Sequence, residues 1–238
     1  FVSVYFEDDM DIYFARQLTN ERLQEVGDRL PEGYGKPSMG PNASGLGQVL
    51  WYTVERAPGV TEEQVSDMDL RTLQDWNVRL LLRTAAGVDD VTSWGGDEKQ
   101  FQVLIQPQKL IKYGLSFKAV MEALAANNRQ VGGQYVNLGR EQYLVRGLGL
   151  VTGTRDIGNV VITQREGSPI YVRDVAEVKE APGLRFGAVT RDGKEVALGM
   201  ALARINENAK NVVDAVKAKL KLAQQALPKG VSIIPVYD

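Results

Sequence analysis

The chain alternates strand-like and helix-like segments, and this alternation limits its fold more than any other feature. Short apolar runs with the β-branched and aromatic content of strands occur at residues 1–6, 48–55, 90–94, 100–105, 196–204 and 231–236. Between them apolar residues recur at helical spacing, and one expected buried stripe contains Leu70, Leu73, Trp76, Leu80 and Leu81. Several strand-like runs between residues 142 and 190 follow one another without a helix. The pattern predicts an α+β fold, with helices on one face of antiparallel or mixed sheets.

Polar residues mark where the helices begin. Asp11, Ser66, Ser116 and Asn208 each precede a run of helical spacing, and each side chain can accept a backbone N–H of the first turn. These helices are expected to begin directly after their capping residues.

Two of these helices end in the same way. Leu30-Pro31-Glu32-Gly33 closes the first and Leu227-Pro228-Lys229-Gly230 closes the last, because proline cannot continue a helix. The separation between cap and leucine is the same in both. An internal duplication explains this match, and chance recurrence of a common helix exit is the alternative. Duplication predicts two split βαβ units, the second carrying a strand-rich insertion.

Composition excludes several classes of function. The 238 residues include no cysteine and no histidine, so cysteine nucleophiles, serine–histidine pairs and zinc fingers are ruled out. A net charge of −2 provides no basic surplus for nucleic acid or for an anionic membrane surface. The longest apolar runs, such as Leu80 to Leu82, fall far short of the roughly 18 residues that span a bilayer. The residues alone indicate a non-enzymatic protein with no cofactor, nucleic-acid partner or membrane segment.

Carboxylates beside a flexible glycine pair are candidate cation ligands. Asp89, Asp90, Asp97 and Glu98 flank Gly95-Gly96, and such oxygens suit a hard or borderline divalent cation. Solvated loop charge is the alternative interpretation. The methionines are scattered along the chain, which argues against a thioether site for Cu(I).

Two other clusters are weaker candidates. Asp8, Asp9 and Asp11 lack the central glycine and terminal glutamate of a calcium loop, so we expect helix capping and solvated charge there. The glycine-rich run 147–153 fits neither the dinucleotide nor the Walker pattern, and we expect a protruding flexible loop.

Collinear motifs over the whole chain resemble the heavy-metal branch of the resistance–nodulation–division efflux pumps. They include Asp11-Ile12-Tyr13-Phe14-Ala15-Arg16, Met39-Gly40-Pro41 with Gly45-Leu46-Gly47, Leu70-Arg71-Thr72-Leu73-Gln74-Asp75-Trp76, Gln100-Phe101-Gln102-Val103, Tyr143-Leu144-Val145-Arg146, Arg173-Asp174-Val175-Ala176 and Val236-Tyr237-Asp238. Each motif is weak alone, and their common order makes the resemblance specific. It implies the first periplasmic loop of such a pump, with ferredoxin-like porter subdomains and part of a docking subdomain.

The resemblance implies a division of the chain into three parts. Residues 1–95 would form the first porter subdomain, truncated at its N-terminus. Residues 96–132 and 185–238 would form the second, and residues 133–184 the docking insertion. A loop carrying Arg146, Leu148, Thr152, Arg155 and Asp156 would reach a neighbouring subunit.

Function in the resembling family is cation/proton antiport at the inner membrane of Gram-negative-type bacteria. The resemblance implies a periplasmic location, a transported metal cation, a trimeric parent pump, and contacts with a periplasmic adaptor and an outer-membrane channel. The proton path of such pumps lies in membrane helices that this chain lacks.

The motifs also bear on the transported metal. Leu184 stands where the copper and silver pumps have methionine, which favours divalent cations such as Zn, Co, Cd or Ni. Gln48 stands where the divalent pumps often have glutamate. The expected metal-facing residues are Gln48, Asp89, Asp97 and Glu98.

Several alternatives remain. A Cu(I) or Ag(I) pump of the same branch is one, and a free-standing periplasmic metal-binding or adaptor module is another. A related exporter of organic compounds would require an aromatic pocket instead of carboxylates. A hydrolase is the most distant alternative, because without histidine it needs a serine–lysine or paired-carboxylate site.

Overall fold

A computed structural model describes residues 2–27, 29–31, 35–129, 131–138, 141–147 and 149–238, and between 131 and 147 it describes the backbone alone. Its main element is a four-stranded sheet of β1 (Gln48–Arg56), β2 (Val88–Trp94), β11 (Ala197–Ala203) and β12 (Val231–Tyr237). The strand order is β12-β1-β11-β2, and every neighbouring pair is antiparallel. The predicted α+β class is confirmed.

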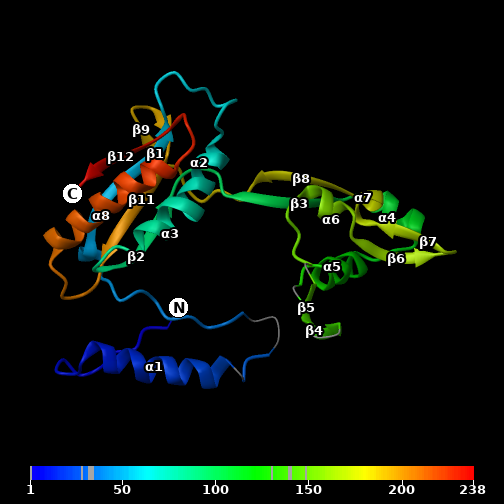
Figure 1. Cartoon of the computed structure of the whole chain (residues 1–238), viewed down its shortest axis with the longest axis horizontal. Helices are drawn as coiled ribbons and strands as arrows, with labels where there is room; N and C mark the ends of the chain where they lie inside the picture. The colour runs from blue at the N-terminus through cyan, green and yellow to red at the C-terminus, as the bar shows by residue number, and fades with distance from the viewer. Residues whose placement is uncertain (1, 28, 32–34, 130, 139–140, 148) are drawn as a thin grey trace.

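Two helical segments cover one face of this sheet (Figure 1). The first, which we call the helical arm, comprises α2 (Asp67–Leu73), a π-helical turn η2 (Gln74–Val78) and α3 (Arg79–Leu82). The second is α8 (Ala209–Ala226). The arm joins β1 to β2, and α8 joins β11 to β12, so each helix connects two parallel strands that are separated by one antiparallel strand. These are two interleaved split βαβ halves.

Apolar residues of sheet and helices form the main core between these layers. Leu50 and Val54 of β1 pack with Val216 of α8, and all three are fully buried. Burial of each such side chain contributes about 1.5–3 kcal/mol. The predicted caps are present, since the side chains of Ser66 and Asn208 accept N–H groups of the first turns of α2 and α8.

The sheet joins strands from two of the predicted subdomain ranges. The strands β1 and β2 fall in the range predicted for the first porter subdomain, residues 1–95, yet they pair with β11 and β12 of the range 185–238. The predicted boundary at residue 95 therefore separates strands that pair in one sheet. The physical reason is that neither βαβ half is complete alone: each leaves a gap between its parallel strands, and a strand of the other half fills it.

The residues between the two halves form a second unit, which we call the insertion unit. It begins with β3 (Lys99–Ile105) and ends with β8 (Ala176–Pro182), and these two strands pair along their whole length. Figure 1 shows them as a long ribbon leading away from the four-stranded sheet. Residues 99–105 thus pair within the insertion unit. The prediction had grouped them with residues 185–238.

The rest of the insertion unit is built from short elements. They are α4 (Pro107–Tyr113), α5 (Phe117–Ala126), β4 (Val131–Leu138), β5 (Glu141–Gly147), α6 (Thr154–Gly158), β6 (Val161–Arg165), β7 (Ser168–Tyr171) and α7 (Val172–Val175). Val120, Val172 and Val175 are fully buried in its two small cores. The hairpins β4–β5 and β6–β7 confirm the expected strands in this stretch, but the expectation that no helix separates them is wrong, because α6 and α7 lie among them. The minor elements elsewhere are η1 (Gly45–Gly47), β9 (Thr190–Arg191) and β10 (Lys194–Glu195).

The N-terminal segment differs from the prediction. Residues 2–6 form no strand, and Val2 and Tyr5 are largely exposed. No partner strand for them lies in the described part of the chain, and an isolated strand is not stable in water. The helix α1 (Ile12–Gly27) follows, with the Asp11 side chain accepting the Phe14 N–H as predicted. The helix α1 lies apart from the sheet (Figure 1). The helix that occupies the place equivalent to α8 in the other βαβ half is therefore the helical arm, and not α1 as the matching helix ends had predicted.

None of the helices in the described ranges has the length and apolarity needed to cross a bilayer.

Candidate functional site

The predicted metal-facing residues lie at two opposite ends of β2. Gln48 opens β1 and is half-buried, opposite Leu202 of β11. Asp90 of β2 lies opposite the same Leu202 from the other side. Gln48 and Asp89 therefore reach the same end of the sheet, while Asp97 and Glu98 follow the other end of β2.

Asp89 is already engaged within the protein. Its Oδ2 accepts the backbone N–H of Asn42 at 2.6 Å, and its Oδ1 lies 3.9 Å from Nε of Arg204. The Asp89 side chain is only 18% exposed. A metal ion at Asp89 would have to approach a carboxylate that is compensated by a guanidinium, so this end of the sheet is not a preformed cation site.

Asp97 faces an arginine as well. Nη1 of Arg185 lies 3.4 Å from Oδ1 of Asp97, and the same guanidinium forms an ion pair with Glu195. Oδ1 of Asp97 is buried and has no hydrogen-bond donor, so the long ion pair is its main compensation. Arg185 thus holds two carboxylates where the chain returns from the insertion unit to the sheet.

Glu98 is exposed beside Asp97, and its backbone carbonyl accepts the N–H of Gly183 at 2.8 Å. This bond ties together the two chain segments that connect the sheet to the insertion unit. Across the described ranges, no three acidic side chains come together as a metal cluster. The structure brings the four predicted residues into two separate pairs.

The turn between Asp97 and β2 has the glycine geometry that the sequence suggested. Gly95 and Gly96 have φ of 66° and 65°, in the left-handed region that glycine tolerates best. Nη1 of Arg71 donates to the Gly95 carbonyl at 2.6 Å and fixes the turn against the helical arm. A hollow of about 450 Å³ beside this turn is bordered by Trp94, Leu184 and Phe186, all of them exposed.

The predicted subunit-docking loop is partly described. Leu148 and the Arg146 side chain lie outside the described residues, and the Arg146 backbone belongs to β5. Arg155 and Asp156 lie in the first turn of α6, and Thr152 lies two residues before this helix. The Thr152 N–H and hydroxyl both donate to Oδ2 of Asp156, at 3.0 Å and 2.6 Å, so these hydrogen bonds fix the loop to the start of the helix.

These bonds also act on the charge of the loop. The Thr152 hydroxyl, and then its backbone N–H, stabilise the ionised carboxylate and hold the pKa of Asp156 below its ordinary value. Gly149 fits in the same loop because a Cβ there would overlap the Arg129 carbonyl oxygen. The loop is therefore held at this point by close packing and by its own hydrogen bonds, and the flexibility expected from its glycine content stays a prediction.

The sequence analysis did not identify the two arginines that form ion pairs with the acidic residues. Arg185 lies 88 positions along the chain from Asp97, and Arg204 lies 115 positions from Asp89. Nothing in the local sequence around either arginine indicates a carboxylate partner.

Comparison with known proteins places this fold in one family. The sequence profile of the AcrB/AcrD/AcrF family matches residues 1–238. Protein HelA of Legionella pneumophila is 46% identical over 238 residues, and the cobalt-zinc-cadmium resistance protein CzcA of Cupriavidus metallidurans is 42% identical over 240 residues. Each alignment covers 100% of this chain and 22% of the relative.

A solved structure agrees. A crystal structure of a heavy metal efflux pump superposes with a TM-score of 0.79 and 31% sequence identity, covering 98% of this chain and 22% of the pump chain. The chain spans about a fifth of the length of the proteins that it matches. The full-length profile match and the shared fold show that this chain belongs to the AcrB/AcrD/AcrF family, among relatives that include heavy-metal efflux pumps.

Proposed function

We propose that this chain is the periplasmic porter and docking part of a proton-driven pump that exports heavy-metal cations. The observation that carries the proposal is similarity over the whole chain to CzcA, a protein named for cobalt, zinc and cadmium resistance. The matched crystal structure is described as a heavy metal efflux pump, which supports the same class of substrate. The role is transport and not enzymatic catalysis.

The position of the acidic residues supports a path for ions more than a storage site. Asp89 and Asp97 each face an arginine, so neither can hold a cation tightly in this arrangement. A transport route needs this property, because an ion that binds too tightly does not leave. In this proposal Gln48, Asp89, Asp97 and Glu98 border the route, and the principal ligands belong to other parts of the pump.

Divalent cations are the proposed cargo. Leu184 is 81% exposed beside the Gly95–Gly96 turn, and it offers no sulfur to a soft ion there. A Cu(I) or Ag(I) pump is the second candidate. Met200 favours it, because this thioether is buried on the face of β11 opposite the core that Ala197 and Ala201 enter.

The proposal also includes partners and location. The pump would sit in the inner membrane of a Gram-negative-type bacterium with this chain in the periplasm. It would form a trimer and deliver metal through a periplasmic adaptor to an outer-membrane channel. The hydrogen bonds between Thr152 and Asp156 suit a rigid arm that contacts a neighbouring subunit.

Metal tolerance of living cells tests the function. The full-length protein that carries this chain, expressed with its adaptor and channel in a metal-sensitive strain, should raise tolerance of Zn, Co, Cd or Ni. Raised tolerance of copper and silver alone supports the second candidate. Unchanged tolerance of every metal, with the protein present in the membrane, refutes the proposal.

A calorimetric titration of the 238-residue chain tests the third alternative. We expect no binding of Zn²⁺, Co²⁺, Ni²⁺ or Cu⁺ at micromolar affinity or tighter, because the carboxylates are compensated. Tight binding would instead favour a free-standing metal-binding module.

A further inference from the structure

In the helical arm, buried side chains recur at every fourth residue, whereas on an ordinary α-helix they recur at alternating steps of three and four. Its buried row consists of Leu70, Gln74, Val78 and Leu82, none of them more than 1% exposed. Next to this row lies a charged row of Arg71, Asp75, Arg79 and Arg83, and then a third row of Thr72, Trp76 and Leu80.

The π-helical turn makes these straight rows possible. On a regular α-helix each four-residue step overshoots a full turn by about 40°, so a row of four residues drifts by roughly 120°. A π turn accommodates about one extra residue, and this residue reduces the drift around the helix axis by roughly 100°. The turn at 74–78 therefore keeps the charged and the third row on one side of the arm. Such turns occur frequently at functional sites.

This side of the arm forms one wall of a groove of about 520 Å³. Glu98, Lys99 and Phe101, at the start of β3, form the other wall. Trp76 is 72% exposed, and Leu80 and Phe101 are also exposed. Tryptophan and arginine are the residues most enriched at the energetic centres of protein interfaces.

The charges of the groove are uneven. Arg71 is paired with Asp75 at 2.7 Å, and Lys99 with Glu180 at 2.7 Å. Arg79 and Arg83 share one carboxylate, Asp90, at 3.5 Å and 3.3 Å, and no other acidic partner of either lies in the described part of the chain.

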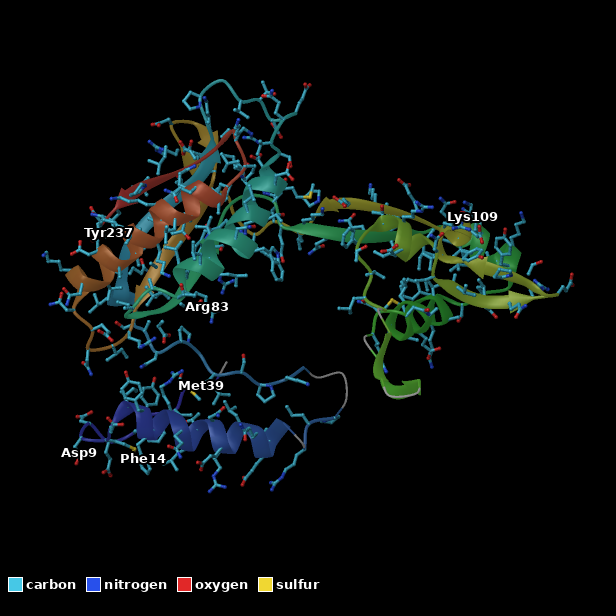
Figure 2. All side chains as sticks on the ribbon, in the orientation of Figure 1. Asp9, Phe14, Met39, Arg83, Lys109 and Tyr237 are labelled. Atoms are coloured by element: carbon cyan, nitrogen blue, oxygen red, sulfur yellow. The ribbon has the colours of Figure 1, made fainter. Side chains whose placement is uncertain are left out.

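This sharing leaves one positive charge without an ion-pair partner at the Arg79–Arg83 end. The groove's other charge without an ion pair in the described part of the chain is the carboxylate of Glu98, on the opposite wall. Nε of Arg79 is buried without an acceptor, and Arg83 is half-exposed. Figure 2 shows Arg83 at the C-terminal end of the arm, beside β2. A guanidinium with free N–H groups pairs best with a carboxylate, often bidentately.

We propose that this groove binds a segment of a partner protein that carries a carboxylate next to an aromatic or aliphatic side chain. The carboxylate binds Arg83 and Arg79, and the apolar side chain packs on Trp76 and Leu80. The Arg79–Arg83 end disfavours a metal cation, so this end of the groove is separate from the proposed ion route, which Glu98 borders on the opposite wall. The inference does not depend on transport.

Peptide binding to the 238-residue chain tests the proposal. The probe is the tripeptide acetyl-Asp-Phe-Leu-amide, and its matched control is acetyl-Asn-Phe-Leu-amide, which differs by one charge. The Trp76 indole N–H signal, assigned with Trp76→Phe, is followed by NMR. We expect saturable shifts at Trp76 with both peptides, and binding of the Asp peptide about threefold tighter or more.

Three variants separate the contributions. Arg83→Gln should remove the preference for the Asp peptide, and Trp76→Ala should weaken both peptides. Asp90→Asn should tighten binding of the Asp peptide, because it releases both arginines. A gain of affinity cannot come from a damaged fold. Arg22→Gln on α1, where Arg22 pairs with Glu25, is the control that should change nothing.

Four results would overturn the proposal. The first is the absence of saturable shifts at millimolar peptide, and the second is equal binding of the two peptides. The third is a Trp76 signal that moves with protein concentration alone, which would identify a second copy of the chain as the occupant. Equal competition by acetate would show that the groove takes small carboxylates and not a protein segment.

Discussion

Tyr52 of β1 lies directly opposite Gly199 of β11, and its ring covers the glycine so closely that a Cβ on Gly199 would overlap the ring and the hydroxyl. Gly199 thereby makes room for the largest fully buried side chain of the core. The hydroxyl of Tyr52 accepts a hydrogen bond from Nε2 of Gln74 at 3.0 Å. One glycine thus positions the tyrosine that anchors the helical arm to the sheet.

Gly199→Ala should lower the free energy of unfolding by about 1–3 kcal/mol, because the added methyl group overpacks the core. Urea denaturation measures the change. In the background of Tyr52→Leu the cost should shrink, giving a coupling energy above about 0.5 kcal/mol. Gly187→Ala, where a Cβ meets nothing, is the control and should leave stability unchanged or slightly raised. Equal cost in both backgrounds would contradict this account.

Alkaline pH should destabilise the fold through Tyr52. Burial raises the pKa of this phenol well above its ordinary value, so the unfolded chain releases the proton near pH 10 while the folded chain retains it. Below pH 10 the stabilisation is fully present, and above it the free energy of unfolding should fall by at most about 1.4 kcal/mol per pH unit from this group. Tyr52→Phe should show a shallower fall between pH 10 and 11. Parallel slopes in the two proteins would contradict the assignment.

The phase of the helical arm shows where sequence reasoning reached its limit. Spacing of three and four residues predicted a buried stripe with Trp76 and Leu80, yet both are exposed and Gln74 is fully buried. The cause is the π turn, which shifts the phase by one residue. Hydrophobicity alone could not reveal it, because the shift places a polar glutamine in the core.

The candidate site was predictable to a similar degree. Strand positions and helix caps follow local rules, so Ser66 and Asn208 were identified correctly. The partners of acidic residues depend on strand order. Once β11 lies between β1 and β2, Arg204 reaches Asp89, and no local pattern contains that information.

Gln74 should tolerate an apolar replacement only when the Tyr52 hydroxyl is removed as well. Its Nε2 donates to Tyr52 and to Ser93, while its Oε1 is buried without a donor. Gln74→Met should cost about 1–3 kcal/mol, because the Tyr52 hydroxyl loses its buried partner. Gln74→Met combined with Tyr52→Phe should be more stable than Gln74→Met alone. Thermal unfolding followed by circular dichroism gives the comparison, and additive costs would contradict it.

Thr152→Val should raise the pKa of Asp156 towards its ordinary value. The hydroxyl is the largest cause of the lowered pKa, and the nearby Arg155 is the smallest. Arg155→Gln should therefore raise the pKa less than Thr152→Val does. Carbon NMR of the carboxyl group during an acid titration measures both. The Thr152–Asp156 hydrogen bonds are fully present above the ordinary pKa of about 3.9 and should be lost as pH falls through the lowered value. A larger shift in Arg155→Gln would contradict the order of causes.

Arg185→Gln should turn a compensated pair of carboxylates into a weak cation site. Arg185 bridges Asp97 and Glu195, whose side chains are 22% and 23% exposed, so removal of the guanidinium leaves two partly buried negative charges together. We expect Zn²⁺ to bind the Arg185→Gln variant of the 238-residue chain about tenfold tighter than the wild-type chain. The reason is that the repulsive guanidinium is gone and the carboxylates gain a counter-ion. Calorimetry measures the affinity, and circular dichroism checks that the fold is kept. Adding Asp97→Asn should cancel the gain, while Lys118→Gln, a distant cation on α5, should not alter zinc affinity. Unchanged affinity in Arg185→Gln would show that this arginine does not exclude metal from the acidic pair.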